Sequence, residues 1–143
     1  MRAGLFGLAA SAVLFAAGMA GAATLHFTTT LKGADEVPAN TTAGTGLVAA
    51  TLDTATKTLS YKVLYSGLTG PATMAHFHGP AASGVNAGVQ VPVPTSALPS
   101  PMIGAATLDD SQIADLEAGK WYFNIHTAAH PGGEIRGQLS AAK

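Results

Sequence analysis

The sequence predicts an all-β protein, an antiparallel Greek-key β-sandwich or barrel with one short helix near residues 109–118. Three observations lead to this fold class. Short runs rich in Thr, Val, Leu and aromatic residues recur along the chain, and several of them alternate apolar with polar positions. Clusters of Gly, Pro, Asn and Asp separate these runs. A single segment has the pattern of a helix, so the remaining runs, about six to eight short strands, must form the sheet.

The first 22 residues have the pattern of a secretory signal peptide. Arg2 gives a positive start, residues 5–15 form a short apolar stretch, and small residues follow. The triplet Ala20–Ala22 fits the small-x-small cleavage rule, so we expect a mature domain of residues 23–143. The alternative, a membrane anchor, needs about 20 apolar residues, and this stretch is shorter. We therefore expect a periplasmic or secreted protein.

Composition limits both the source of stability and the partners. The chain has no cysteine, so packing, or packing plus a bound ligand, must stabilise the domain without disulfides. Its 7 basic and 8 acidic residues give a net charge of −1 and no basic patch, which argues against a nucleic-acid partner. No segment after the signal peptide is apolar enough to span a membrane. The expected partner is a metal ion or an extracellular protein.

The strands are expected in the following order. They cover residues 24–31, 46–52, 58–64, 75–78, 89–93, 120–127 and 134–139. The polar loop 53–57 predicts an antiparallel hairpin between the second and third strands. Pro92 places the fifth strand at an edge of the sheet, because proline cannot donate to a ladder. Residues 94–101, with two flanking prolines, are expected to form a loop.

The one predicted helix lies between the fifth and sixth of these strands. Asp109 or Asp110 can cap its N-terminus, since both have short acceptor side chains. Gly119 suits the left-handed position that ends a helix. The helix is therefore expected near residues 109–118.

Strand alternation places several polar side chains away from the core. In the strand 120–127, Trp121, Phe123 and Ile125 form one apolar stripe and should face inward. His126 then faces the other way, with Asn124 beside it. By the same rule Phe77 faces inward, and the histidines on either side of it face outward. We also expect an outward position for Glu134 and Arg136 in the last strand.

The five histidines are the strongest lead to function, because four of them fall in two tight clusters. His76 and His78 share one face of a strand, with backbone positions about 6.5–7 Å apart, so their rings can converge on one ion. His126, from a strand far along the chain, can complete a ligand set, with His130 as a weaker further ligand. An all-nitrogen set suits copper(II), zinc or nickel, and copper binds tightest in the affinity order.

Structural roles for the same residues stay open at this point. His76, His78 and His126 can each hydrogen-bond a loop carbonyl and hold a turn in place. His130 precedes Pro131 in a loop, where a structural or solvated role is the alternative. Glu134 and Arg136 can form a surface ion pair of little energetic value. In the functional interpretation Glu134 orients an imidazole and Arg136 guides an anion.

The histidine segments resemble the signature of the CHRD domain, a family named after chordin and common in exported bacterial proteins. The segments that carry the resemblance are His76–Ala81, Trp121–Thr127 and Pro131–Leu139. Leu31–Pro38 and Leu108–Gly119 also fit, so the resemblance covers nearly all of residues 23–143. It implies an exported domain and no particular activity.

The order of elements is similar, more distantly, to that of copper/zinc superoxide dismutases. The shared features are Leu31–Gly33, Gly67–Thr69, the pair of histidines around Phe77, a late strand ending in His126, and Arg136 in the final strand. This similarity implies a superoxide dismutase-like, immunoglobulin-like sandwich, with His76, His78 and His126 as copper ligands and Arg136 as an anion guide. The zinc-binding loop, bridging histidine and disulfide of that family have no counterpart here, which argues against dismutase activity.

Three functions follow as hypotheses. The first is an exported metal-binding module, with copper as the expected cofactor, for storage, delivery or protection. The second is a metal-free extracellular adhesion or assembly module in which the histidines are scaffold. The third, ranked lowest, is a dismutase-type redox enzyme.

Overall fold

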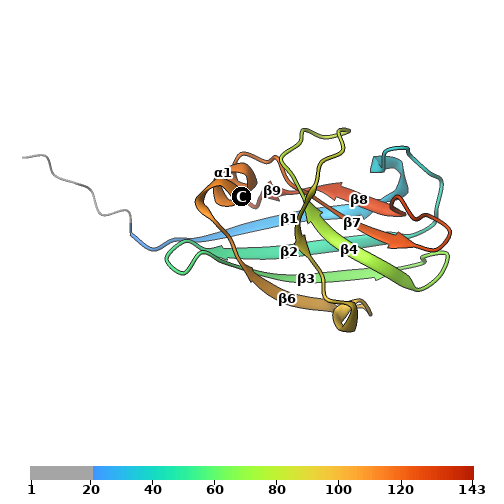
Figure 1. The fold of residues 1–143 in the computed structure, drawn as a ribbon, viewed down its shortest axis with the longest axis horizontal. Coiled ribbons are helices and arrows are strands. Elements are labelled where there is room, and N and C mark those ends of the chain that lie inside the picture. Colours follow the sequence, from blue (N-terminus) through green and yellow to red (C-terminus); the bar gives the residue numbers. More distant parts are fainter. Residues whose placement is uncertain (1–20) are drawn as a thin grey trace, which may run out of the picture.

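The computed structural model describes residues 21–143 (Figure 1). Residues 1–20, which hold most of the predicted signal peptide, lie outside the described residues. Within residues 21–143, no helix has the length and apolar character needed to cross a membrane.

Residues 21–143 contain nine strands and three short helices. The strands are β1 (Thr24–Lys32), β2 (Thr45–Asp53), β3 (Thr58–Ser66), β4 (Ala72–His78), β5 (Val89–Pro92), β6 (Met102–Thr107), β7 (Tyr122–Thr127), β8 (Ile135–Gln138) and β9 (Ser140–Ala141). The helices are the α-helix α1 (Asp110–Glu117) and the 3₁₀ turns η1 (Gly33–Asp35) and η2 (Thr95–Ala97).

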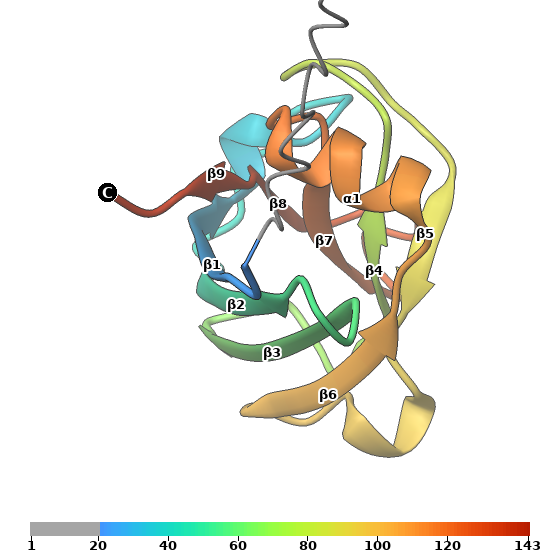
Figure 2. The same ribbon diagram turned by 90° about the vertical axis from the view of Figure 1, so that its left-hand side faces the viewer.

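The strands form one antiparallel sheet that curls into a nearly closed barrel. Their order is β5-β4-β7-β8-β1-β2-β3-β6, and β9 adds to β1. Viewed end-on, β1, β2, β3 and β6 form one wall, and β8, β7, β4 and β5 face it (Figure 2). Among residues 21–143 no pairing joins β5 to β6, so the barrel stays open there. The chain crosses between the walls after β3, after β5 and after β6, as in a Greek key. The predicted fold class is confirmed.

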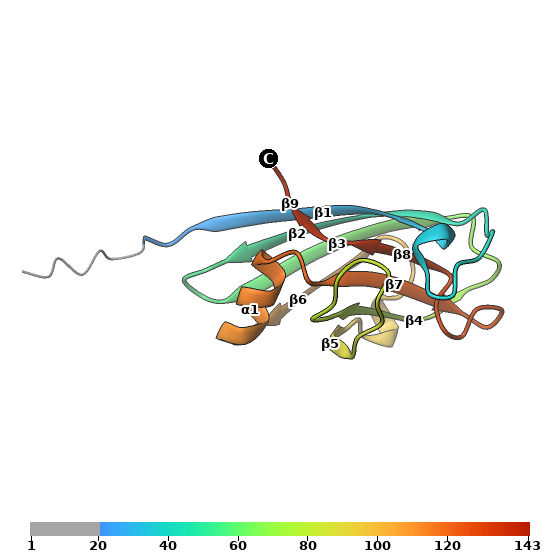
Figure 3. The same ribbon diagram turned by 90° about the horizontal axis from the view of Figure 1, so that it is seen from above.

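The predicted elements are found with small shifts in their ends. The β2–β3 hairpin turns at residues 54–57, and β5 lies at an edge of the sheet, as expected from Pro92. Asp109 caps α1 and forms a reciprocal capping box with Gln112. Gly119 follows the helix with a φ of 72°. Seen from above, α1 lies at one end of the barrel (Figure 3).

The strand β6 was missed in the sequence because it lacks an alternating pattern. Its register pairs Gly104 with Tyr61 of β3. A Cβ atom at Gly104 would clash with the Tyr61 ring, so the small residue makes room for the aromatic one. Residues 94–101 are not wholly irregular, because η2 lies within them. The short β9, which pairs with Phe27 and Thr28, was also not predicted.

An aromatic cluster fills the barrel and fixes the orientation of β4 and β7. Phe77 is fully buried, with its ring edge-on to those of Tyr61 and Phe123 at centroid distances of 5.1 and 4.7 Å. Trp121 packs on the same ring. Because Phe77 is anchored inward, the two flanking histidines of β4 must project from the outer face of the barrel wall.

Candidate metal centre

Three of the four clustered histidines, His76, His78 and His126, lie on neighbouring strands. β4 and β7 pair antiparallel, with His76 opposite Asn124 and His78 opposite Tyr122. His126 is two residues beyond Asn124 and so lies on the same face. The strand pairing therefore places three imidazoles, separated by up to 50 residues in sequence, on one patch of the outer wall.

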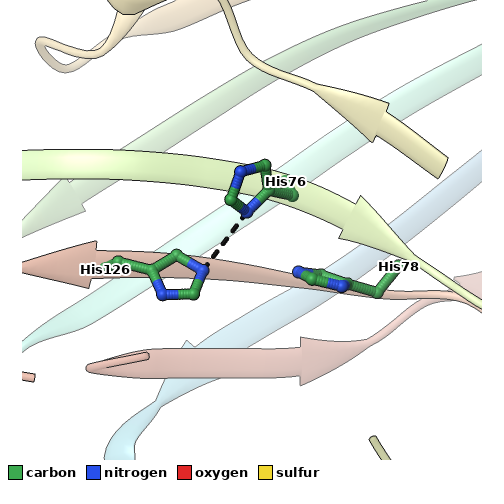
Figure 4. A group of neighbouring side chains, drawn as sticks. All are labelled: His76, His78 and His126. Carbon is green, nitrogen blue, oxygen red and sulfur yellow. Dashed lines mark hydrogen bonds between the residues drawn. The ribbon is translucent and has the colours of Figure 1, made fainter. Parts of the chain in front are cut away.

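The three rings converge. One ring nitrogen from each of His76, His78 and His126 can be chosen such that all three lie within 4.8 Å of one another. Nδ1 of His76 is 3.2 Å from Nε2 of His126, and His78 turns a ring nitrogen toward both (Figure 4). The ring centroid of His76 lies 5.3 Å from that of His78 and 5.1 Å from that of His126. Small shifts of these side chains would bring the nitrogens to a single ion.

Backbone carbonyls orient two of the three rings. Nδ1 of His126 lies 2.9 Å from the carbonyl oxygen of Pro131, and Nδ1 of His78 lies 3.0 Å from that of Ala87. A carbonyl can only accept, so each Nδ1 carries the proton. In a neutral His126 ring, Nε2 then keeps its lone pair, as a metal ligand requires. Nε2 of His78 lies 2.9 Å from Oδ1 of Asn124. In a neutral His78 ring this nitrogen is an acceptor, so the Asn124 amide must turn its NH2 group toward it.

The cluster also favours neutral imidazoles. Burial lowers the pKa of His76 to about 4, and the neighbouring His126 and His78 add to this effect. Burial likewise lowers the pKa of His78, although its hydrogen bonds to Ala87 and Asn124 oppose the shift. Rings that stay neutral do not have to lose a proton before they bind a metal.

A covering segment, defined as residues 79–88, folds over part of this outer face. Ala87 contacts both the ring of His78 and the hydroxyl of Tyr122. The Tyr122 ring stacks on His78 with a centroid distance of 4.7 Å and an angle of 5° between planes. His78 is buried under these contacts, His126 is also buried, and His76 is half-buried. The three rings are therefore not a row of freely exposed side chains.

Burial of Arg136 and Glu134 corrects our expectation that they face solvent. Arg136 is 2% exposed, and Glu134 is fully buried. Among residues 21–143 no ion pair joins the two side chains, so they do not form the surface pair considered above. The covering segment and the neighbouring loops bury this face, which alternation alone could not reveal.

Glu134 lies among threonines and not beside an imidazole. Its carboxylate accepts hydrogen bonds from the hydroxyls of Thr42, Thr69 and Thr127 and from the backbone N–H of Thr69. Burial raises the pKa of Glu134, but these hydrogen bonds outweigh it and lower the pKa to about 2. The carboxylate therefore fastens the two loops that hold Thr42 and Thr69 to the end of β7.

His130 is not part of the three-histidine group. It lies in the loop after β7, where its backbone exchanges hydrogen bonds with Thr127. His130 is one of the residues that line a hollow between Val37–Asn40 and Ala129–Gly133.

Sequence reasoning missed two residues beside the site. Asn124 lies between the histidines, and its Oδ1 is 2.9 Å from Nε2 of His78. Glu36 is buried, and its Oε1 has no hydrogen-bond partner. Burial raises the pKa of Glu36 to about 7, although the charge of Arg136 opposes this shift. No local pattern marks Glu36, because it follows a 3₁₀ turn in a polar stretch.

The geometry defines an antiparallel β-barrel with a three-imidazole cluster on its outer wall. A model of the CHRD domain family matches residues 27–139, so the chain belongs to this family. No curated protein and no solved structure matches the chain. The more distant similarity to copper/zinc superoxide dismutases therefore remains an expectation from the sequence.

Proposed function

We propose that this CHRD-domain protein is an exported metal-binding module that holds copper at His76, His78 and His126. The observation that carries the proposal is the convergence of these rings from two strands, with one nitrogen of each within 4.8 Å of the others. Histidines that serve as scaffold need not share a point in space.

The surroundings of the rings support a metal role. Ligand histidines usually donate their second ring N–H to a carbonyl or carboxylate, as His78 and His126 do here. An all-imidazole set without thiolate suits copper(II), which heads the affinity order for divalent ions. A metal–nitrogen bond at Nε2 of His78 would replace the contact of this atom with Asn124.

Export fits this role. The predicted signal peptide at residues 1–22 would direct the domain to the periplasm or the cell exterior. A copper site there would serve storage, delivery or protection from the free ion.

A metal-free adhesion or assembly module is the second candidate. Leu47 and Leu64 are register partners on the outer face of β2 and β3, and both are exposed. Ile103 of the adjacent β6 is 63% exposed. Exposed apolar residues gathered on one face are typical of interaction surfaces. A dismutase finds less support, because Arg136 is buried and its guanidinium is hydrogen-bonded to Val85 and Asn86.

Metal content of the untagged chain lacking residues 1–22 tests the proposal. We expect one equivalent of copper(II) per chain, lost in His76→Ala and in His126→Ala. His26→Ala is the matched control, because His26 is exposed and its ring contacts Thr51 on another strand. Circular dichroism shows whether each variant is folded. A folded wild-type protein that takes up no copper, zinc or nickel would overturn the metal proposal and favour the adhesion module.

A further inference from the structure

Met74, whose side chain ends in a thioether, lies next to the three histidines in the strand register and is not part of the barrel core. Met74 is on β4, two residues before His76 and four before His78. Side chains at this spacing share one face of a strand. Its register partner on β7 is His126. Met74 is therefore a neighbour of two of the three rings, one along its own strand and one across the ladder.

The local backbone brings Met74 toward this position. The β4–β7 register passes from Ala72 opposite Thr127 directly to Met74 opposite His126, so Thr73 is an extra residue in β4. Such bulges redirect the side chains that follow them. Directly opposed residues have Cβ atoms about 4.5–5.5 Å apart, and the three rotatable bonds of methionine let its sulfur swing over that range.

The exposure of Met74 also points to a ligand. It is 45% exposed, whereas its neighbours on the inner face, Ala75 and Phe77, are fully buried. Packing in the core therefore does not fix the Met74 side chain. Its register position beside His126 places the thioether within reach of the three-imidazole group.

We propose that Met74 is the fourth ligand of the site and that it makes the site a holder of copper(I). This inference rests on the proposed metal function. Thioether sulfur is a soft ligand that selects copper(I). It adds little for zinc or copper(II), because water oxygen fills their remaining positions beside three imidazoles. The site would then bind copper in both oxidation states, with Met74 acting mainly on the reduced one.

Competition titrations with the untagged chain test the role of Met74. Copper(I) is titrated without oxygen against bathocuproine disulfonate, and copper(II) is titrated against a chelator of known affinity. Met74→Leu should weaken copper(I) binding about tenfold or more, equivalent to about 1.4 kcal/mol, and change copper(II) binding less than about threefold. Met102→Leu is the matched control. It removes the other methionine of residues 21–143, which is buried in the core, and should leave both affinities unchanged.

X-ray absorption of the copper(I)-loaded protein gives a second readout. We expect a sulfur neighbour in the wild type and in Met102→Leu, and only light scatterers in Met74→Leu. If the wild type binds copper(I) without a sulfur neighbour and Met74→Leu has the same affinity, the Met74 proposal is wrong and the three-histidine site stands. If the wild type binds neither oxidation state, the proposed function itself has failed.

Discussion

The guanidinium carbon of Arg136 lies 3.5 Å from the centre of the Tyr122 ring. The same guanidinium donates hydrogen bonds to Oδ1 of Asn86, at 2.8 Å, and to the carbonyl oxygen of Val85, at 2.6 Å. Arg136 thereby holds the covering segment against β7. Ala87, the next residue in that segment, accepts the hydrogen bond from His78. Through the covering segment, Arg136 thus helps to orient the ring of His78.

Arg136→Lys should loosen the covering segment. Lysine keeps the charge but loses the planar fork that reaches two acceptors and stacks on a ring. We expect the free energy of unfolding to fall by about 2 kcal/mol. Copper(II) affinity should fall about tenfold, because His78 loses its fixed orientation. Urea denaturation, hydrogen exchange of the amides of residues 84–88 and metal titration measure the three effects.

The reverse substitution, Lys62→Arg at an exposed site, is the control. Unchanged exchange in residues 84–88 would show that Arg136 does not hold this segment.

Glu36 should make the barrel less stable as pH rises. Its pKa is 4.5 in the reference state and about 7 in the folded protein, where burial outweighs the charge of Arg136. Between these values the folded state keeps a proton that the unfolded chain has lost, so the free energy of unfolding falls as pH increases. At about 1.4 kcal/mol per pKa unit, the full loss is up to about 3 kcal/mol and is complete above about pH 7.

Glu36→Gln removes this dependence, because glutamine is neutral at every pH. The variant should gain stability relative to the wild type as pH rises from about 4 to about 8, by up to about 3 kcal/mol. Urea denaturation at several pH values measures the difference. Glu117→Gln, at an exposed position on α1, should show no such trend. A constant difference between Glu36→Gln and the wild type across this range would mean that Glu36 does not titrate near 7.

The elements of this fold could be predicted wherever a local pattern reports on burial. The stripe of Trp121, Phe123 and Ile125 has a period of two, and all three side chains are in the core. The same period put His126 on the opposite face. β6 gave no such signal, because Gly104 and Ala105 are small and the strand is defined by its fit to Tyr61.

The site could be predicted only in part, because it depends on contacts between distant segments. The pairing of β4 with β7, which brings His76 near His126, leaves no mark in either strand's own sequence. The covering segment is built of small residues, so its contact with Arg136 could not be read from a pattern. Arg136 and Glu134 consequently looked exposed although both are buried.

His130→Ala should leave metal binding unchanged. His130 lines the hollow beside Val37–Asn40, and its ring is not one of the three converging rings. We expect copper(I) and copper(II) affinities within about threefold of the wild type, which is less than about 0.7 kcal/mol. His126→Ala, a histidine four residues away, is the contrasting variant and should abolish binding. If folded His130→Ala loses most of its copper affinity, His130 is a ligand. It would then occupy the fourth coordination position that we assign to Met74.

Glu134→Ala should unfold the protein more easily without altering the chemistry of the histidines. The substitution removes the acceptor for hydroxyls of Thr42, Thr69 and Thr127, at least one of which is itself fully buried. The buried Thr127 hydroxyl left without its partner, together with the lost charge-assisted hydrogen bonds of Thr42 and Thr69, should cost about 3 kcal/mol. Thermal and urea denaturation measure this loss, and Glu117→Ala, at an exposed position, should stay within about 0.5 kcal/mol of the wild type. Below its unfolding temperature Glu134→Ala should keep wild-type copper affinity, because its carboxylate contacts no imidazole. A selective loss of copper affinity in the folded variant would instead give Glu134 the role of orienting a histidine.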